Sequence, residues 1–186
     1  MTKLISLTKS HPKFFNTTQY KAMFSPDFAV GWHAIDRHLR SMLPNCAFHH
    51  YKNSDPNDLL DNIAVCEWED GHLYCVSYGL SALYYNEASY GNLISKYGFE
   101  LTFHIVKALQ PFSLEVYVQF LQEIAKLIIH TDLDTSQYQH KFELNESTLK
   151  LLNHQYTYFS LSADPILKKM GSPHGQHQFI EIHLHV

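Results

Sequence analysis

Near the C-terminus, two histidines and a glutamate have the residue types and spacing of a metal site. Period-2 alternation over residues 178–186 places Glu181, His183 and His185 on one face of a predicted strand, with aliphatic residues on the other. Imidazole and carboxylate groups are ordinary zinc ligands, so these three residues are candidate metal ligands. The alternative is a half-exposed strand whose polar residues face water and bind no metal.

A tyrosine- and asparagine-rich segment, residues 79–96, supplies a second set of candidates. Tyr84, Tyr85, Asn86 and Glu87 follow one another in it. Exposed tyrosines offer rigid contact area with a polar tip, which is typical of protein-recognition surfaces. The alternative is that the rings cover a sheet edge and contact nothing beyond it. Long ordered loops often carry function, so we treat these four residues as candidate partner-binding residues.

Enzymatic motifs are absent from the sequence. It contains no G-x-S-x-G, no H-E-x-x-H and no glycine-rich phosphate loop, and only 7 glycines in total. Cys75 lies in the middle of an apolar run, where a small buried hydrophobic residue is expected. A reactive thiol needs a partly exposed, electropositive setting instead. We therefore expect a non-catalytic protein without a cofactor.

Composition limits the class of protein and of partner. The 186 residues fit one domain, and 45% hydrophobic residues suffice for a sizeable core. Eighteen acidic residues outnumber 14 basic ones, so nucleic acid is not expected as the main partner. No stretch approaches the ~18 apolar residues of a membrane span, and no secretory signal is recognised. Three cysteines without a C-x-x-C spacing fit a reducing cytoplasm, so we expect a cytoplasmic protein.

Local signals predict the helices that must position these residues. Residues 1–24 lack periodicity and are predicted to be an irregular leader, followed by one domain over residues 25–186. Ser25-Pro26-Asp27 is a helix-start signal, followed by apolar residues at helical spacing up to Pro44. A second helix is predicted after Pro111, and its broad apolar stripe indicates that it lies flat on a sheet.

Most of the residues outside the two predicted helices show patterns that are typical of strands. Alternating or apolar runs predict strands over residues 47–51, 62–68, 72–78, 98–106, 156–161 and 178–186. Glu69-Asp70-Gly71 is predicted to be a hairpin turn, because Asp and Gly tolerate positive φ. The order of elements predicts an α+β fold, with helices packed on a mixed sheet.

Several segments together resemble the Suppressor of fused family. They are Gly31-Trp32-His33-Ala34-Ile35-Asp36, residues 58–65, the Y-G-L-S-x-L-Y motif at 78–84, the G-F-E-L-T-F motif at 98–103 and Ala163-Asp164-Pro165-Ile166-Leu167. The resemblance covers about residues 25–186. It implies a non-catalytic binding domain with an α/β sandwich. The animal protein of this family restrains transcription factors of Hedgehog signalling by gripping a short peptide as an added strand in a cleft between two lobes. This chain resembles its first lobe.

The chain departs from the family pattern at two positions that contribute to peptide binding in the animal lobe. Cys75 stands where the family has a tyrosine, and Asn86 stands where it has an aspartate. That peptide specificity is therefore not carried over. Stand-alone bacterial members are regarded as immunity proteins, so the resemblance implies a bacterial immunity protein that binds and neutralises a cognate toxin. The alternatives are a peptide-binding regulatory protein, or a metal-binding protein that uses Glu181, His183 and His185.

Overall fold

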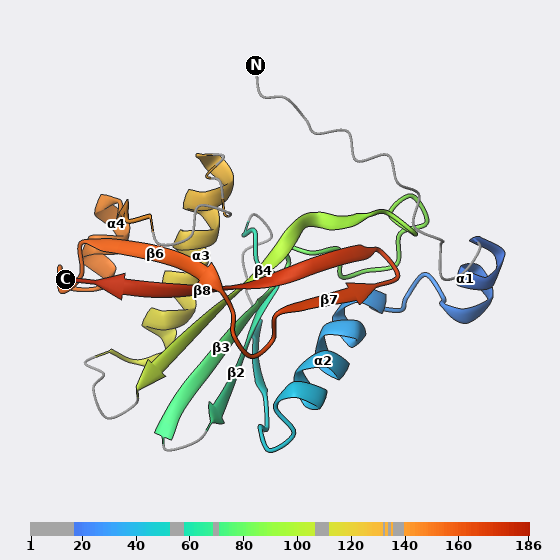
Figure 1. Ribbon diagram of the computed structural model, residues 1–186, viewed down its shortest axis with the longest axis horizontal. Helices are drawn as coiled ribbons and strands as arrows, with labels where there is room; N and C mark the ends of the chain where they lie inside the picture. Colours follow the sequence, from blue (N-terminus) through green and yellow to red (C-terminus); the bar gives the residue numbers. More distant parts are fainter. Residues whose placement is uncertain are drawn as a thin grey trace.

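A mixed eight-stranded sheet forms the centre of the molecule (Figure 1). The structure is a computed structural model that describes residues 17–52, 58–68, 71–106, 112–131, 133, 135 and 140–186. The helices are α1 (Thr17–Met23), α2 (Val30–Met42), α3 (Leu114–His130) and α4 (Glu146–Leu151). The strands are β1 (His49–Lys52), β2 (Asn62–Trp68), β3 (His72–Tyr78), β4 (Ile94–Val106), β5 (Phe142–Glu143), β6 (Tyr158–Ala163), β7 (Lys169–Ser172) and β8 (Gly175–His185).

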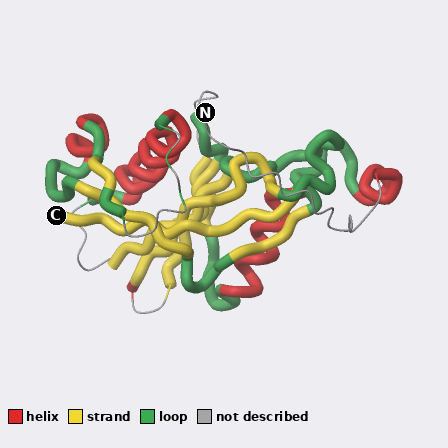
Figure 2. The backbone as a smooth tube through the Cα atoms, turned by 45° about the horizontal axis from the view of Figure 1, so that its top comes forward, coloured by secondary structure: helices red, strands yellow, loops and turns green. Residues whose placement is uncertain are grey.

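The strands follow the order β1-β2-β3-β4-β8-β6-β5, and β7 pairs with β8 outside this path. The pairing is antiparallel except between β4 and β8, which run parallel with Phe103 opposite Ile182 at the end of their register. Helices flank the sheet in Figure 2. The architecture confirms the predicted α+β fold with helices on a mixed sheet.

Alternation along the strands divides the interior into two main cores. Ile63 and Val65 of β2 belong to the core that includes α3, whereas Ala64 and Cys66 belong to the core that includes α2. Successive side chains of a strand point to opposite faces, so α2 and α3 cover opposite faces of the sheet. No helix in the described ranges is long and apolar enough to cross a membrane.

The elements with the clearest periodicity form where the sequence predicts them. β2 and β3 have the predicted bounds, and α3 follows Pro111 as expected. Within the predicted turn between β2 and β3, Gly71 has φ +77°, while Glu69 and Asp70 lie outside the described residues. Three short elements, β5, α4 and β7, were not predicted, because two to six residues are too few to show a period.

Two predictions about the N-terminal part are wrong. Residues 17–23 form α1 although an irregular leader was predicted, because Tyr20 is buried against residues distant in the sequence. Residues 1–16 of the predicted leader lie outside the described residues. The next helix, α2, begins at Val30 rather than after Ser25-Pro26.

The start of α2 is set by a long-range contact. The backbone N–H groups of Gly31 and Trp32 donate to the Leu83 carbonyl at 2.8 and 3.2 Å. A Cβ at position 31 would lie 1.9 Å from the Ala82 carbonyl oxygen, so only glycine permits this approach. The helix start therefore depends on the loop after β3, which local start signals do not reveal.

The buried carboxylate of Glu100 holds the chain where β3 ends. Oε1 accepts hydrogen bonds from the backbone N–H of Gly79 (3.1 Å) and from both the N–H and the hydroxyl of Ser81 (2.9 and 2.6 Å). Oε2 accepts from the Ser77 hydroxyl (2.6 Å) and the Leu80 N–H (3.4 Å). Burial raises the pKa of Glu100, while these hydrogen bonds oppose that rise. One side chain thus fixes the path of residues 77–81.

Burial also lowers the pKa of four histidines, because it disfavours the charged imidazolium. The pKa falls to about 4 for His104 and His177, and it falls for His174 and His183 as well. His177 is 3% exposed, and neither of its ring nitrogens has a hydrogen-bond partner among the described residues. Its neutral form is therefore required in the folded protein.

The pair formed by His104 and Glu181 behaves differently. His104 Nδ1 lies 3.2 Å from Glu181 Oε1, and burial, followed by the nearby Asp164, raises the pKa of Glu181 to about 7. Burial raises the pKa of the carboxyl and lowers that of the imidazole, so near pH 5.5 the folded pair still holds one proton, which His104 and Glu181 share. The unfolded chain holds one proton too, on the imidazole. The pair thus contributes little to the pH dependence of stability, whereas His177 has no such compensation.

We expect Glu100→Ala to lower the free energy of unfolding by about 3 kcal/mol or more, because it leaves several buried donors without an acceptor. Urea unfolding followed by circular dichroism measures this change. Glu87→Gln is the control, since it removes an exposed carboxylate, and its effect should stay below about 1 kcal/mol. Equal effects of the two substitutions would contradict the assigned role of Glu100.

We expect His177 to make the protein less stable as pH falls from about 6.5 to 4. Its folded pKa of about 4 lies below the unfolded value of 6.5, so in this window the unfolded chain binds more protons. His177→Leu should reduce this loss by about 3 kcal/mol. The exposed His49, changed to Leu, is the control. An unaltered slope of unfolding free energy against pH in His177→Leu would show that His177 does not cause the loss.

Candidate partner-binding surface

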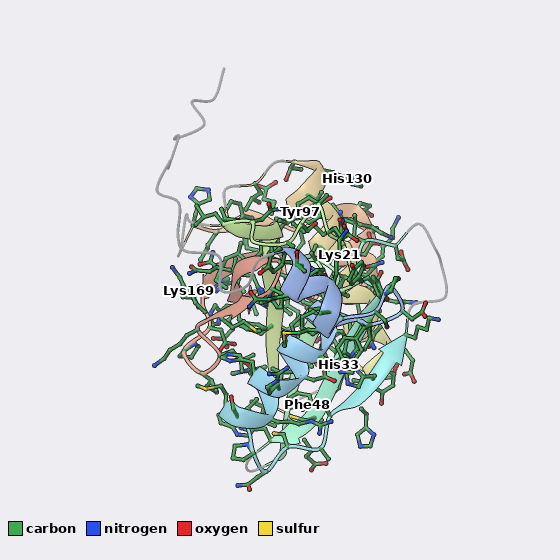
Figure 3. The ribbon with its side chains drawn as sticks, turned by 90° about the vertical axis from the view of Figure 1, so that its right-hand side faces the viewer. Lys21, His33, Phe48, Tyr97, His130 and Lys169 are labelled. Atoms are coloured by element: carbon green, nitrogen blue, oxygen red, sulfur yellow. The ribbon has the colours of Figure 1, made fainter. Side chains whose placement is uncertain are left out.

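The segment between β3 and β4 runs beside the start of β4. The Ala82 N–H donates to the Ser95 hydroxyl at 2.9 Å, and the Tyr97 N–H donates to the Leu80 carbonyl at 3.0 Å. The Glu100 hydrogen bonds fix the beginning of this segment. An ordered loop is therefore presented at one end of the molecule, where Figure 3 shows Tyr97 and Lys21.

The structure brings the four predicted partner-binding residues into this loop and gives them different surroundings. Tyr84 is 55% exposed, and burial of the rest of the side chain together with Asp61 raises its pKa. Tyr85 is half-buried, stacks on Tyr20 at 5.0 Å between ring centroids, and donates its hydroxyl to Glu87 at 3.0 Å. Of the two tyrosines, Tyr84 is thus the one available for a partner.

Asn86 and Glu87 are exposed, and both have contacts inside the molecule. The Asn86 Oδ1 accepts from the Ala88 N–H at 3.0 Å, which closes a local turn. Glu87 forms an ion pair with Lys21 of α1 at 2.7 Å. These contacts stabilise the loop and connect it to the N-terminal helix.

Three further exposed apolar residues lie where this segment meets β4: Leu93 and Ile94, which the sequence did not single out, and Tyr97, one of the clustered tyrosines of the connection. Leu93 is 40% exposed, Ile94 58% and Tyr97 44%. An irregular register between Ile94 and Phe99 accompanies this exposure, and Lys96 has a positive φ of 52° there. The signal was available, since Leu93-Ile94 is an apolar pair inside an otherwise polar connection. We call Tyr84, Leu93, Ile94 and Tyr97 the apolar loop surface.

The three predicted metal ligands do not converge on one point. Glu181 Oε2 lies 3.8 Å from His183 Nε2, but that same nitrogen is hydrogen-bonded to the Ser162 hydroxyl at 2.8 Å. His185 Nε2 is paired with the Ser160 hydroxyl at 2.8 Å. Among the described residues, no three His, Cys, Asp or Glu side chains are grouped so that they could hold a metal ion. The alternative of a metal site at Glu181, His183 and His185 is therefore wrong for this geometry.

Cys75 has the surroundings of a core residue. It is buried in β3, and burial raises the pKa of its thiol to about 12. A thiol that stays protonated near neutral pH is a poor nucleophile. The expectation of a small buried hydrophobic residue is confirmed.

A hollow lies between α2 and the chain that leads into β1. It measures about 610 Å³, and its polar wall contains Asp36, Arg40 and His50. Asp36 accepts a hydrogen bond from the Tyr78 hydroxyl at 2.7 Å. The Asn62 amide, at 3.1 Å, occupies the Nδ1 side of His50. Asp36 and His50 are therefore engaged in hydrogen bonds that stabilise the fold.

Comparisons with known proteins place the fold. The model of the family "Suppressor of fused protein (SUFU)" matches residues 57–183. A chain of the Sufu–Fu complex crystal structure is similar, with a TM-score of 0.69, 21% identity, and coverage of 85% of this chain and 76% of that chain. No curated protein matches this chain.

Two further solved structures show the same fold. Drosophila Suppressor of Fused gives a TM-score of 0.69 at 21% identity, over 86% of this chain and 43% of that chain. A putative SUFU homologue from Neisseria gonorrhoeae gives 0.50 at 16% identity, over 83% of this chain and 76% of that chain. The chain thus spans less than half of the Drosophila protein.

Proposed function

This chain belongs to the Suppressor of fused family, and from that premise we propose that it is a non-catalytic protein-binding regulatory domain. The observation that carries the proposal is the apolar loop surface, in which Tyr84, Leu93, Ile94 and Tyr97 are all at least 40% exposed. Exposed apolar residues gathered on an ordered loop are typical of a protein-interaction site.

The physical case for this surface lies in its preorganisation. Backbone N–H groups of Ser81, Ala82 and Tyr97 donate to Glu100, to the Ser95 hydroxyl and to the Leu80 carbonyl, and these hydrogen bonds fix the backbone of the segment. A partner that binds there orders few side chains, so little of its binding energy is lost to entropy. Tyrosine combines a large apolar ring with a polar tip, which suits Tyr84 to the centre of such a contact.

We further propose that the partner is a toxin domain that this chain neutralises. Two observations support this proposal: the net charge of -4 and the absence of catalytic motifs from the sequence. A toxin that attacks nucleic acid is often basic, and an acidic inhibitor associates with a basic partner faster because of charge steering.

A second candidate function is peptide binding by strand addition. β1 is the terminal strand of the sheet order, pairs with β2 alone, and is exposed at all four residues. An exposed edge strand of this kind can accept an extended peptide through backbone hydrogen bonds. That function would place the contact at β1 rather than at the apolar loop surface.

We expect Tyr84→Ala to weaken partner binding at least tenfold while the unfolding midpoint stays close to that of the wild type, because the Tyr84 side chain is 55% exposed. Calorimetric titration with the partner measures the affinity. Tyr158→Ala is a matched control, since Tyr158 is a partly exposed tyrosine on β6. Wild-type affinity in both Tyr84→Ala and Ile94→Ala would exclude this surface as the binding site.

The partner is obtained by capturing the protein from its own cells at low salt, with mass spectrometry of what is retained. We expect one near-stoichiometric partner that arrests growth when expressed alone and is harmless when co-expressed with this chain. A stoichiometric partner without toxicity would contradict neutralisation and leave the regulatory binding role.

A further inference from the structure

Tyr20 is the fully buried side chain among the described side chains of the N-terminal helix α1, whereas Lys21, Ala22 and Met23 are exposed. The half-buried Phe24, which follows the helix, packs on Tyr20 with 5.3 Å between ring centroids. Figure 1 shows α1 at the far end of the molecule, beyond the sheet and α2. The ion pair between Lys21 and Glu87 is half-exposed and therefore weak.

The polar end of Tyr20 meets one acceptor and one donor. Its hydroxyl lies 2.6 Å from His174 Nε2, and the Asn86 N–H donates to the hydroxyl oxygen at 3.3 Å. His174 Nδ1 lies 3.1 Å from the Ala82 carbonyl, which only accepts, so Nδ1 carries the ring proton. Nε2 is then an acceptor, and the Tyr20 hydroxyl donates to it. The Tyr20 hydroxyl therefore both donates a hydrogen bond, to His174, and accepts one, from Asn86.

The ring of Tyr20 lies among aromatic side chains of the loop. Its centroid is 5.0 Å from that of Tyr85 and 4.5 Å from that of Tyr90. Ring separations of this size are favourable for aromatic pairs. Burial lowers the pKa of His174, which keeps its Nε2 lone pair free to accept the phenol proton. The surroundings thus recognise a phenol by shape and by hydrogen bonding.

None of these recognising groups belongs to α1. Four of them are on the loop after β3, and His174 is in the turn between β7 and β8. Loop and turn are joined without Tyr20, since the Gly91 N–H donates to the Pro173 carbonyl at 2.9 Å and the Gln176 N–H donates to the Leu93 carbonyl at 3.0 Å. The loop and the turn that surround the phenol of Tyr20 are therefore held together by contacts that do not involve α1.

We propose that Ala82, Tyr85, Asn86, Tyr90 and His174 form a tyrosine-binding socket, that Tyr20 is its exchangeable occupant in the free protein, and that a tyrosine of the protein partner replaces it. The identity of the second occupant rests on the proposed function. The socket and Tyr84 belong to the same loop, because Tyr84 lies between Ala82 and Tyr85 in the sequence. The tethered Tyr20 ring has an effective concentration in the roughly millimolar range, so a partner must add contacts on that surface to displace it.

The first test empties the socket with Tyr20→Ala and refills it with p-cresol, the side-chain analogue of tyrosine. We expect p-cresol to raise the melting temperature of Tyr20→Ala and to restore the hydrogen-exchange protection of the Asn86 amide. Toluene has the same shape without the hydroxyl, and it should bind at least tenfold more weakly because His174 and the Asn86 N–H would lose their partner. Equal effects of the two compounds, or no effect of p-cresol on folded Tyr20→Ala, would overturn the socket.

The second test uses the wild-type protein, so that it does not depend on the folding of Tyr20→Ala. An excess of p-cresol over the effective concentration of the tethered ring should increase hydrogen exchange in residues 17–24 while residues 82–90 stay protected. Met23→Ala, an exposed change on the same helix, should respond as the wild type does. Joint loss of protection in both segments, or no change in either, would show that Tyr20 is fixed core packing and not an exchangeable occupant.

A third measurement tests the second occupant once the partner is in hand. Removing the competing ring with Tyr20→Ala should tighten partner binding at least threefold, whereas Tyr84→Ala should weaken it. Unchanged partner affinity in Tyr20→Ala would overturn the exchange of tyrosines. The p-cresol tests involve no partner, so their failure leaves the proposed binding at the apolar loop surface standing.

Discussion

The carboxylate of Glu100 is the constraint on which the loop end of the molecule depends. A fully buried carboxylate is costly unless its oxygens are hydrogen-bonded, and here they accept from Ser77, Gly79, Leu80 and Ser81. Gly79 has φ +136°, and a Cβ there would lie 2.7 Å from the Leu59 carbonyl oxygen. The Glu100 carboxylate, the two serine hydroxyls and Gly79 therefore act together to fix the path of the chain from β3 into the loop.

This unit explains why two of the motifs that resemble the family occur together. The donors belong to the Y-G-L-S motif and its preceding serine, and the acceptor belongs to G-F-E-L-T-F. Asp164 of the A-D-P-I-L segment has a similar role: its side chain accepts from the Tyr74 and Thr102 hydroxyls at 2.5 and 2.6 Å, and from the N–H groups of two following residues. These motif residues stabilise the fold. They therefore identify the family, but they do not indicate which partner is bound.

Sequence reasoning predicted the helices and strands whose residue pattern lies within the element itself. Strands β2 and β3 show clear runs between turn residues, and α3 shows a broad apolar stripe, so all three were found. The sequence did not predict α1, because its one buried residue, Tyr20, contacts His174 at a separation of 154 residues. The alternative of a metal site also depended on contacts that are distant in the sequence. Alternation placed Glu181, His183 and His185 correctly along one strand, but hydroxyls on the neighbouring β6 engage both histidines.

The candidate surface was predicted in part. The sequence indicated this loop as a candidate surface, and the structure exposes Tyr84, whereas Tyr85 stacks on Tyr20 and Glu87 pairs with Lys21. Which tyrosine points outward depends on α1, whose position is not encoded in the loop itself. The exposure of Ile94 and Tyr97 accompanies an irregular register at the start of β4; the apolar Leu93-Ile94 pair marks the position, but nothing local in the sequence predicts the change of register.

The most direct test of protein binding at this loop is site-specific cross-linking in the native cells. A photoreactive benzophenone amino acid is placed at position 84 and, separately, at position 158 on β6. The proposed function predicts one dominant protein adduct from position 84 and none of the same mass from position 158. An absent adduct at position 84, or the same adduct from both positions at equal yield, would contradict partner binding through the apolar loop surface.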